Sequence, residues 1–412
     1  MSLPPTTSIP GDPQPSPAEA TADASDDEPA CPLVARQIAF EAIPRGAWDR
    51  LLAATSVATA FSRWSVHRAW WDAYGSTAHQ QYLVCVDADA PAGAELDAAA
   101  VRGIAPLMHR HEVEPEDAET ATHMRHGHPT ARAVRPTAKA IFFGASYHAD
   151  YATILAEPSD LEAVAELVVD ALLSGPDLAH GDTDWDVVDL RRLRHDDPAL
   201  PALQRAFERR SVRGGWHVSR ELEDVCPVLT LPDDGDWEAY LSTLDKKDRH
   251  EIRRKIRRAE AAGPNTFRLV EPTPQAVESF IDLHQSKWGD EGLFPATAGG
   301  DRSRRFIHRL AELELETGAD RQLQLGDFEI DGQVVMTAVG FDDGRECLFY
   351  NAGVSRDARD LSPGVTGIAA YLRDRMDAGR RRFDFLRGDE PYKYEWGAVD
   401  EPIYRLLVER FV

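Results

Sequence analysis

The sequence predicts an α/β fold, a mixed sheet with flanking helices, arranged as two similar lobes behind a polar tail. Segments with strand character alternate with amphipathic segments from about residue 33 onward, as expected for a layered α/β protein. A strand–helix–strand pattern with the same spacing begins at Tyr151 and again at Phe349. A length of 412 residues is also long for one domain. We therefore expect a tail over 1–32 and lobes over 33–225 and 226–412.

Composition limits the location and the partners of the chain. Residues 1–32 carry six acids and no Lys or Arg, and are predicted to be disordered because they cannot bury enough apolar surface. The net charge of −24 argues against general affinity for nucleic acid. No apolar run approaches ~18 residues and no signal-like stretch is present, so we expect no membrane span and a cytoplasmic protein. The four cysteines are far apart, which excludes a disulfide framework.

Periodicity and turn residues predict the elements of each lobe. In the first lobe we expect strands at 34–40, 81–86, 101–109, 141–144, 151–155 and 185–190, and helices at 63–74, 161–173 and 199–210. In the second lobe we expect strands at 227–231, 266–270, 322–330, 333–341, 346–354, 382–386 and 404–411, and helices at 237–262, 274–288, 302–317 and 364–378. Asp-Gly pairs at 331–332 and 343–344 favour tight hairpins, so 322–354 should form a meander.

The segment Arg359-Asp-Leu-Ser-Pro-Gly364 follows this meander and opens a helix. The first N–H groups of a helix lack intrahelical partners and carry the positive end of its dipole, so such a loop can bind a pyrophosphate. Arg359 would add charge and Gly364 would allow close approach. The alternative is an ordinary strand-to-helix loop with Ser362 as its N-cap.

The meander, this loop and Phe383-Asp-Phe-Leu-Arg-Gly388 together resemble the acyl-CoA-binding core of GNAT acyltransferases, whose loop reads Arg/Gln-x-x-Gly-x-Gly/Ala. Ser362 replaces one glycine of that pattern. With Tyr392-Lys393-x-x-Trp396-Gly397, the segment is similar to the CelD/BcsL-like branch, which is related to the two-lobed Fem-type aminoacyl transferases. The resemblance covers 34–412 in layout and is specific over about 345–397. It implies tandem GNAT-like lobes that use acetyl-CoA or another acyl-CoA as co-substrate.

The resemblance also implies roles for individual residues. The cofactor-binding residues that it implies are Tyr350, Asn351, Arg359, Ser362, Gly364 and Val365, the first two through the backbone that holds the pantetheine arm. It places Lys393 at the transfer site, where a lysine can stabilise negative charge or transfer a proton. The alternative for Lys393 is a surface lysine beside packed aromatic rings.

Two carboxylates are candidate bases. Asp384 lies between two phenylalanines on a predicted strand, so alternation places it on the face opposite to both rings. It could act as a base if that face lines a cleft; otherwise it is a half-exposed partner of Arg382 or Arg387. Glu390, in the loop after the strand, is the second candidate.

Two further groups are candidate substrate contacts. His284 and Trp288 share a helix face and could contact the acceptor, although a buried histidine stacked on tryptophan fits equally well. Residues 246–258 hold eight Lys or Arg, which form either a solvated helix face or a surface that recognises phosphate. The phosphate would belong to CoA, a nucleotide-linked sugar or a tRNA. The contacts expected in this run are Lys247, Arg253 and Arg257.

A cluster of histidines invites a metal assignment. His109, His111, His123, His126 and His128 fall in or beside a polar segment that has no supporting cysteine. Structural zinc sites usually combine histidine with cysteine at short, fixed spacings. We therefore expect no metal.

The sequence thus predicts an N-acyltransferase that moves an acyl group, with acetyl favoured, from acyl-CoA to an amine by direct attack. The acidic segment 157–160 of the first lobe should repel a pyrophosphate, so the donor site is expected in the second lobe. One alternative is a Fem-like, aminoacyl-tRNA-dependent transferase acting on a cell-envelope precursor. Another is a non-catalytic binding protein with the GNAT fold. The acceptor, a small molecule or an envelope precursor, and the oligomeric state stay open.

Overall fold

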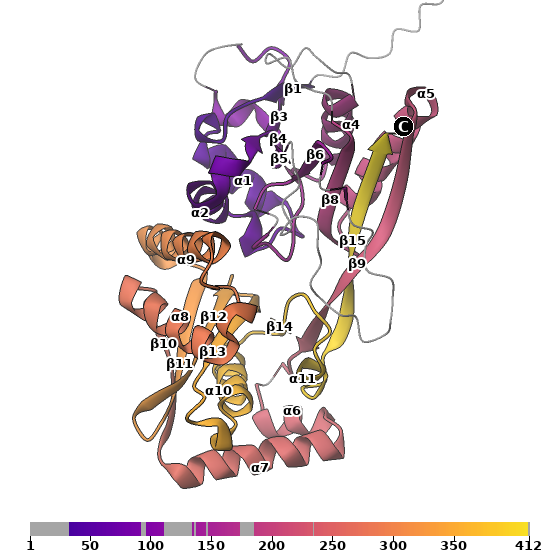
Figure 1. Cartoon of the computed structure of the whole chain (residues 1–412). Coiled ribbons are helices and arrows are strands. Elements are labelled where there is room, and N and C mark those ends of the chain that lie inside the picture. Colours follow the sequence, from indigo (N-terminus) through magenta and orange to yellow (C-terminus); the bar gives the residue numbers. More distant parts are fainter. Residues whose placement is uncertain are drawn as a thin grey trace, which may run out of the picture. The chain divides into compact units, whose positions relative to one another are not determined.

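The computed structural model describes residues 33–91, 96–110, 134–135, 137–145, 147–173, 185–233 and 235–410. Leu33–Val412 forms one compact unit, and the predicted tail lies outside the described residues. An eleven-stranded sheet has the order β10-β11-β12-β13-β14-β9-β15-β8-β6-β5-β2, and a four-stranded sheet has the order β1-β3-β4-β7 (Figure 1). Helices flank both sheets, so the predicted mixed α/β fold class is confirmed.

The elements fall into two successive halves. The first half contains β1 (Leu33–Gln37), α1 (Arg45–Ala54), α2 (Trp64–Tyr74), β2 (His79–Gln80), β3 (Leu83–Asp87), β4 (Val101–Ala105), β5 (Leu107–Arg110), β6 (Ala140–Phe143), β7 (Leu155–Ala156), α4 (Leu161–Leu173), β8 (Val187–Arg194), α5 (Ala199–Gly214) and β9 (Trp216–Thr230). The second half contains α6 (Trp237–Thr243), α7 (Lys246–Ala262), β10 (Asn265–Val270), α8 (Pro274–Trp288), α9 (Ala298–Glu316), β11 (Leu323–Ile330), β12 (Gln333–Asp342), β13 (Glu346–Val354), α10 (Pro363–Asp377), β14 (Arg382–Asp384), α11 (Pro391–Tyr394) and β15 (Val399–Arg410).

The two halves exchange their last strands. β9, from the first half, pairs with β14, whereas β15, at the end of the second half, pairs with β8. β9 and β15 also pair with each other along their length, from Val399↔Val228 to Arg410↔Trp216 (Figure 1). The expected lobe boundary at 225–226 falls inside β9, so one sheet runs through both halves. The division into lobes stays a prediction.

Several sequence-based expectations need correction. The helix expected over 237–262 is broken, because Leu244 is extended and α7 begins at Lys246, after its N-cap Asp245. The strand expected at 227–231 is the end of the much longer β9, whose polar first part hid its strand character. Of the strand expected at 151–155, only Leu155 pairs, within β7. The predicted repeat matches the segment at Tyr151 with the segment at Phe349. In the structure, the strand that corresponds to β13 is instead β6, because the parallel pairs are β6–β8 and β13–β14.

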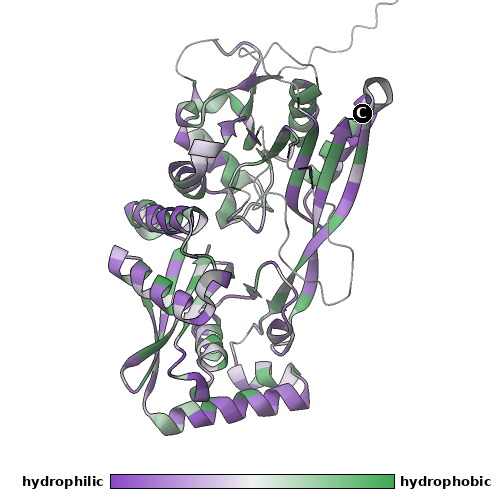
Figure 2. Cartoon of the chain, viewed as in Figure 1, coloured by the Kyte–Doolittle hydropathy of each residue, from purple (hydrophilic) through white to green (hydrophobic). Residues whose placement is uncertain are grey.

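The core consists of three apolar clusters around the sheets. The largest joins α1, α2, α8 and α9, the second lies between α4, α5 and the first-half strands, and the third packs α6, α7 and α10 against the other face of β12–β14. Figure 2 shows the contrast between the apolar strands and the largely hydrophilic α7. The second-half strands are therefore covered on both faces, by α8 and α9 on one and by α10 on the other.

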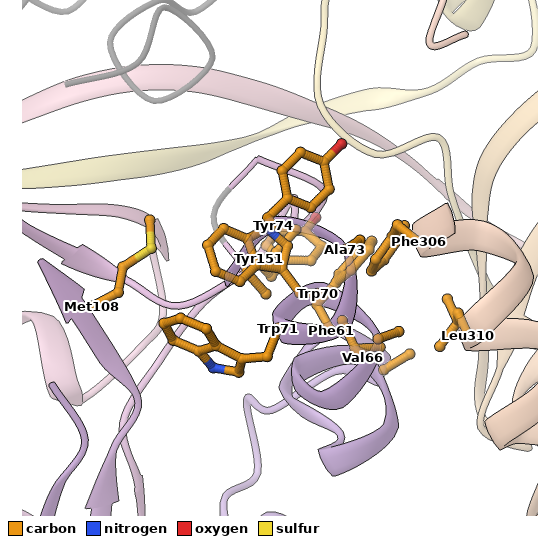
Figure 3. Packing of buried hydrophobic residues seen from close by; sticks show 14 of the residues in the cluster. Phe61, Val66, Trp70, Trp71, Ala73, Tyr74, Met108, Tyr151, Phe306 and Leu310 are labelled. Atoms are coloured by element: carbon orange, nitrogen blue, oxygen red, sulfur yellow. The ribbon is translucent and has the colours of Figure 1, made fainter. Parts of the chain in front are cut away.

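Helices α2 and α9 join the halves. Trp70 and Tyr74 of α2 lie in the same apolar cluster as Phe306 and Leu310 of α9 (Figure 3). The loop residue Tyr151 belongs to this cluster too.

A buried carboxylate secures the same junction. Glu314 of α9 is fully buried and accepts hydrogen bonds from Arg63 Nε (3.1 Å) and Ser65 Oγ (2.5 Å). Its other oxygen accepts the backbone N–H groups of Gln322 (2.9 Å) and Leu323 (3.3 Å). Four donors from two segments, 63–65 and 322–323, thus meet on one carboxylate of α9.

We predict that Glu314→Ala lowers the free energy of unfolding by about 3–5 kcal/mol, because it leaves the largely buried Arg63 guanidinium and two backbone donors without an acceptor. Denaturation in urea measures the loss. Glu312→Ala is the matched control, since Glu312 lies on the same helix with its side chain 53% exposed and should cost no more than about 1 kcal/mol. Equal losses in the two variants would show that Glu314 contributes nothing special to the junction.

Candidate functional site

Strands β13 and β14 form a fork in the sheet. They run parallel but pair only between Glu346–Leu348 and Arg382–Asp384. β13 continues along β12 as far as Val354, whereas Leu386, just after β14, turns with a φ of 58° and the chain leaves the sheet. Beyond Leu348 the edge of β13 that faces β14 therefore has no ladder partner in that strand.

A β-bulge lies at Tyr350, directly beyond the fork. Val339 pairs with Asn351 and Gly340 pairs with Phe349, so Tyr350 has no counterpart in β12. A bulge of this kind breaks the ladder locally and re-aims side chains. Here Phe349 packs in the α10 cluster, whereas the half-buried Tyr350 packs against the cluster of α8 and α9. The Asn351 side chain accepts the N–H of Ala352 (2.8 Å).

The loop before α10 has an unusual backbone. Arg359–Leu361 form a 3₁₀ turn, and Ser362 is left-handed, with φ 53° and ψ 52°. Ser362 occupies the N-cap position of α10, as the alternative interpretation has it, but its side chain makes no capping bond. A Cβ added to Gly364 would meet nothing within 4 Å, so this position faces open space. Gly364 and Val365 belong to the first turn of α10, which Pro363 opens.

The basic helix α7 lies beside this loop. Arg258 donates a hydrogen bond from Nη2 to Ser362 Oγ (2.6 Å). Lys247 is near the opposite end of α7, about 16 Å away along the axis at ~1.5 Å per residue. Only the C-terminal end of the basic run therefore adjoins the loop.

The cations of α7 fall into two groups. Arg253 pairs with Glu238, and Glu251 pairs with Arg254 (2.6 Å) and Lys255 (3.6 Å). By contrast, Lys247 and Arg257 are exposed and have no ion pair within the described part of the chain. The run thus contains both paired surface charges and free ones.

Asp384 lies at the point where the fork opens. It is fully buried, on the face opposite to Phe383 and Phe385, which pack in the α10 cluster. Its Oδ2 accepts the hydroxyl of Tyr151 (2.6 Å), and its Oδ1 accepts the N–H of Leu386 (2.7 Å). Burial raises the pKa of Asp384 to about 6, against the lowering effect of these hydrogen bonds.

Lys393 holds the loop that follows. It is 2% exposed, so the alternative of a surface lysine is wrong. Its Nζ donates to the carbonyl groups of Leu386 (3.0 Å), Arg387 (2.9 Å) and Gly388 (2.9 Å). The same ammonium pairs with Glu390 (2.9 Å), whose side chain is 50% exposed. Since an ammonium has three protons, all of them are engaged within this loop.

The first half reaches the fork through residues 147–151. His148 Nδ1 lies 2.9 Å from the Tyr350 hydroxyl, and Arg387 Nε donates to Asp150 (3.1 Å). Together with the bond from Tyr151 to Asp384, these contacts place a loop of the first half on β13 and β14 of the second. The sequence-based expectations above do not include these contacts. The only local signal is the run of aromatic and ionisable residues after the buried strand β6.

The two residues expected to contact an acceptor lie in different environments. His284 is 2% exposed and packs beside Phe280 and Phe294, at ring distances of 5.8 and 5.2 Å. Burial lowers its pKa to about 4, so the imidazole is neutral at pH 7. Trp288 is 44% exposed, with its ring 6.5 Å from that of His284. Helix α8 packs closely against β13 beyond the fork. A Cβ atom added to Gly353 of β13 would lie only 2.7 Å from the backbone N of His284 in α8.

The described ranges contain no group of three or more His, Cys, Asp or Glu side chains arranged to hold a metal ion. His109 is engaged with Gln81 (3.1 Å), while His111, His123, His126 and His128 lie outside the described residues. Among the helices that the structure describes, none is both long and apolar enough to cross a bilayer.

We predict that Ser362→Gly keeps the loop conformation and changes the free energy of unfolding by less than about 1 kcal/mol. Glycine relieves the strain of the left-handed conformation in the folded state, but its greater freedom stabilises the unfolded state, so the two effects oppose each other. Ser362→Val should lose about 1–2 kcal/mol, because a β-branched residue disfavours φ near 53°. Urea denaturation compares the three proteins. A more stable valine variant would contradict the left-handed assignment.

Stability should also report the titration of Asp384. A carboxyl whose pKa is raised from 3.8 to about 6 on folding contributes stability below its unfolded pKa, which is lost as the pH rises through 6. We predict that the stability of the wild type relative to Asp384→Asn falls by roughly 2–3 kcal/mol between pH 4 and pH 7. Urea titrations of both proteins across this range measure it, and a pH-independent difference would refute the shift.

The geometry can now be compared with known proteins. Residues 246–394 match the family model of the acetyltransferase (GNAT) domain, and no curated protein matches the chain. A conserved protein of unknown function from Bacteroides thetaiotaomicron is similar in fold, with 12% identity, a TM-score of 0.50, and 92% of this chain and 99% of that one covered. FemX is similar with 11% identity, a TM-score of 0.51, and 90% and 96% covered. Residues 246–394 therefore match a GNAT acetyltransferase domain, and the chain as a whole has a fold similar to that of FemX.

Proposed function

We propose that the protein is an N-acyltransferase that moves an acyl group, acetyl in the simplest case, from acyl-CoA to an amine of a small molecule or cell-envelope precursor. The observation that carries the proposal is the fork between β13 and β14, with a bulge at Tyr350, in a domain that matches the GNAT model. The amine would attack the thioester carbon directly. The protein would contribute proximity and hydrogen-bond donors rather than a covalent intermediate.

The donor would lie along β13 and end at the loop before α10. Its pantetheine arm would contact the backbone at Tyr350 and Asn351, where β13 has no partner in β14. Its pyrophosphate would sit at the first turn of α10 beside Gly364, which faces open space. Arg359 is exposed in this loop and Arg258 adjoins it, so both can supply positive charge.

The three candidate catalytic residues would have different roles. Asp384 and Lys393 are buried and engaged with the loop that follows β14, so we assign them to holding the fork open. Glu390 is half-exposed and can accept a proton from solvent or from a bound amine. It is the candidate base, and His284 and Trp288 on α8 would contact the acceptor.

A second candidate function is transfer of an aminoacyl group from tRNA. The likeness of fold to FemX and the exposed, unpaired Lys247 and Arg257 on α7 favour it. Such binding would weaken steeply with salt, because it depends on neutralising phosphates. The two functions differ in the donor and share the fork.

The donor site is tested by calorimetric titration with acetyl-CoA and with free CoA. We expect micromolar binding that Gly364→Asp weakens at least about 100-fold, because a carboxylate enters the anion site at the helix N-terminus. Gly46→Asp is the matched control. Gly46 is likewise the second residue of a helix, α1, and a Cβ there also meets nothing within 4 Å.

Each outcome of the titration has a consequence. Unchanged affinity in a folded Gly364→Asp protein would refute the loop as the pyrophosphate site. No binding of either ligand to the wild type would refute the acyl-CoA donor. Salt-sensitive tRNA binding that is weakened by Lys247→Glu with Arg257→Glu would then establish the second candidate.

A further inference from the structure

A buried chain of four polar side chains leads from α9 to the bulge in β13. Ser303 Oγ lies 2.9 Å from the hydroxyl of Tyr74 on α2, and that hydroxyl lies 2.8 Å from Nε2 of His148. His148 Nδ1 lies 2.9 Å from the hydroxyl of Tyr350. Ser303, Tyr74 and His148 are no more than 4% exposed, whereas Tyr350 is half-buried. The chain therefore starts in the interior and ends beside the fork.

The chemistry of the four groups fixes the direction of their hydrogen bonds. The Ser303 hydroxyl is buried, and among the described residues the Tyr74 oxygen is the acceptor that it contacts, so Ser303 donates to Tyr74. Tyr74 must then donate to His148 Nε2. Burial lowers the pKa of His148 to about 3, so its ring is neutral and carries its one proton on Nδ1. That proton is donated to the Tyr350 oxygen.

This direction leaves the hydrogen of the Tyr350 hydroxyl free to point away from His148. The opposite direction would leave the buried Ser303 hydrogen without an acceptor, which is unfavourable. Burial raises the pKa of Tyr350 well above its ordinary value, so the hydroxyl keeps its proton. Tyr350 can therefore act as a hydrogen-bond donor to a ligand at the fork.

A second donor lies nearby. Arg387, in the loop after β14, uses Nε for Asp150, while its buried Nη1 has no hydrogen-bond partner among the described residues. The positive charge of Arg387 acts on Tyr350, since it opposes the rise in the pKa of that hydroxyl. Among the described residues, neither the hydrogen of the Tyr350 hydroxyl nor the Arg387 Nη1 group thus has an acceptor. Such an arrangement suits a ligand atom that gains negative charge.

We propose that the Tyr350 hydroxyl donates a hydrogen bond to the carbonyl oxygen of the acyl group during transfer, and that Ser303, Tyr74 and His148 are positioning residues that set its direction. This inference rests on the proposed function. Attack by the amine nitrogen places negative charge on that oxygen before the C–S bond breaks. The new C–N bond replaces the C–S bond, the proton lost by the amine balances the one gained by the CoA thiolate, and Tyr350 keeps its own.

The test uses the full-length protein with acetyl-CoA labelled at the carbonyl carbon. Isotope-edited infrared spectroscopy gives the carbonyl stretching frequency of the bound thioester, calorimetry gives the dissociation constant, and release of free thiol gives the rate of acetyl transfer to water. Tyr350→Phe keeps the ring that packs against Phe61 and Phe341 and removes only the hydroxyl. Ser303→Ala removes the start of the chain, and Ser279→Ala removes an exposed helix hydroxyl as the control.

We expect Tyr350→Phe to bind acetyl-CoA within about 3-fold of the wild type, to shift the carbonyl stretch to higher frequency, and to slow transfer by roughly 100-fold. Ser303→Ala should shift the frequency in the same direction by less, and Ser279→Ala should change nothing. Binding with an unchanged frequency and rate in Tyr350→Phe would overturn this inference alone. Failure of the wild type to bind acetyl-CoA would overturn the proposed function, and this inference with it.

Discussion

Beyond Leu348 and Asp384, two neighbouring strands of one sheet stop exchanging hydrogen bonds, and the site depends on this separation. A parallel pair left to itself would continue its ladder, because unpaired backbone groups are costly when they are buried. Here the chain after β14 finds other partners. The carbonyl groups of residues 386–388 accept hydrogen bonds from the Lys393 ammonium. The N–H of Leu386 donates a hydrogen bond to the Asp384 carboxylate. The fork is thus stable as an open structure, because the groups that would close it are already bonded.

Two buried ionisable groups therefore maintain a backbone shape. Burial of a lysine ammonium is tolerated when its protons are all accepted, and three carbonyl groups with one carboxylate achieve this for Lys393. Burial disfavours the charged form of Asp384 and raises its pKa, while the Tyr151 hydroxyl from the first half donates a hydrogen bond to it. The first half therefore contributes to the candidate site. The exchange of β9 and β15 holds both halves in the register that these contacts require.

Local patterns in the sequence predicted much of the second half. The Asp-Gly turns predicted the meander, with positive φ at Asp331 and Gly332, and periodicity predicted α8 residue for residue. These local patterns did not predict the nonlocal features of the fold. The periodicity of 237–262 continues through Leu244, where the chain in fact leaves the helix. The contacts of His148 and Tyr151 join positions about 200 residues apart, which no local pattern encodes.

The serine of the loop bears on the alternative of a non-catalytic binding protein. Ser362 stands where the GNAT pattern has glycine, and the loss of a glycine that the donor requires would favour that alternative. Glycine is favoured at a position where the backbone is left-handed, because it has no Cβ. Ser362 adopts the same left-handed conformation, with φ 53°. The serine therefore strains the backbone locally but does not change the conformation of the loop. The open space beside Gly364 is kept. Ser362 also gains a hydrogen bond from Arg258, which brings a guanidinium to the turn where a phosphate would bind. The departure from the pattern thus gives no reason to expect an empty donor site.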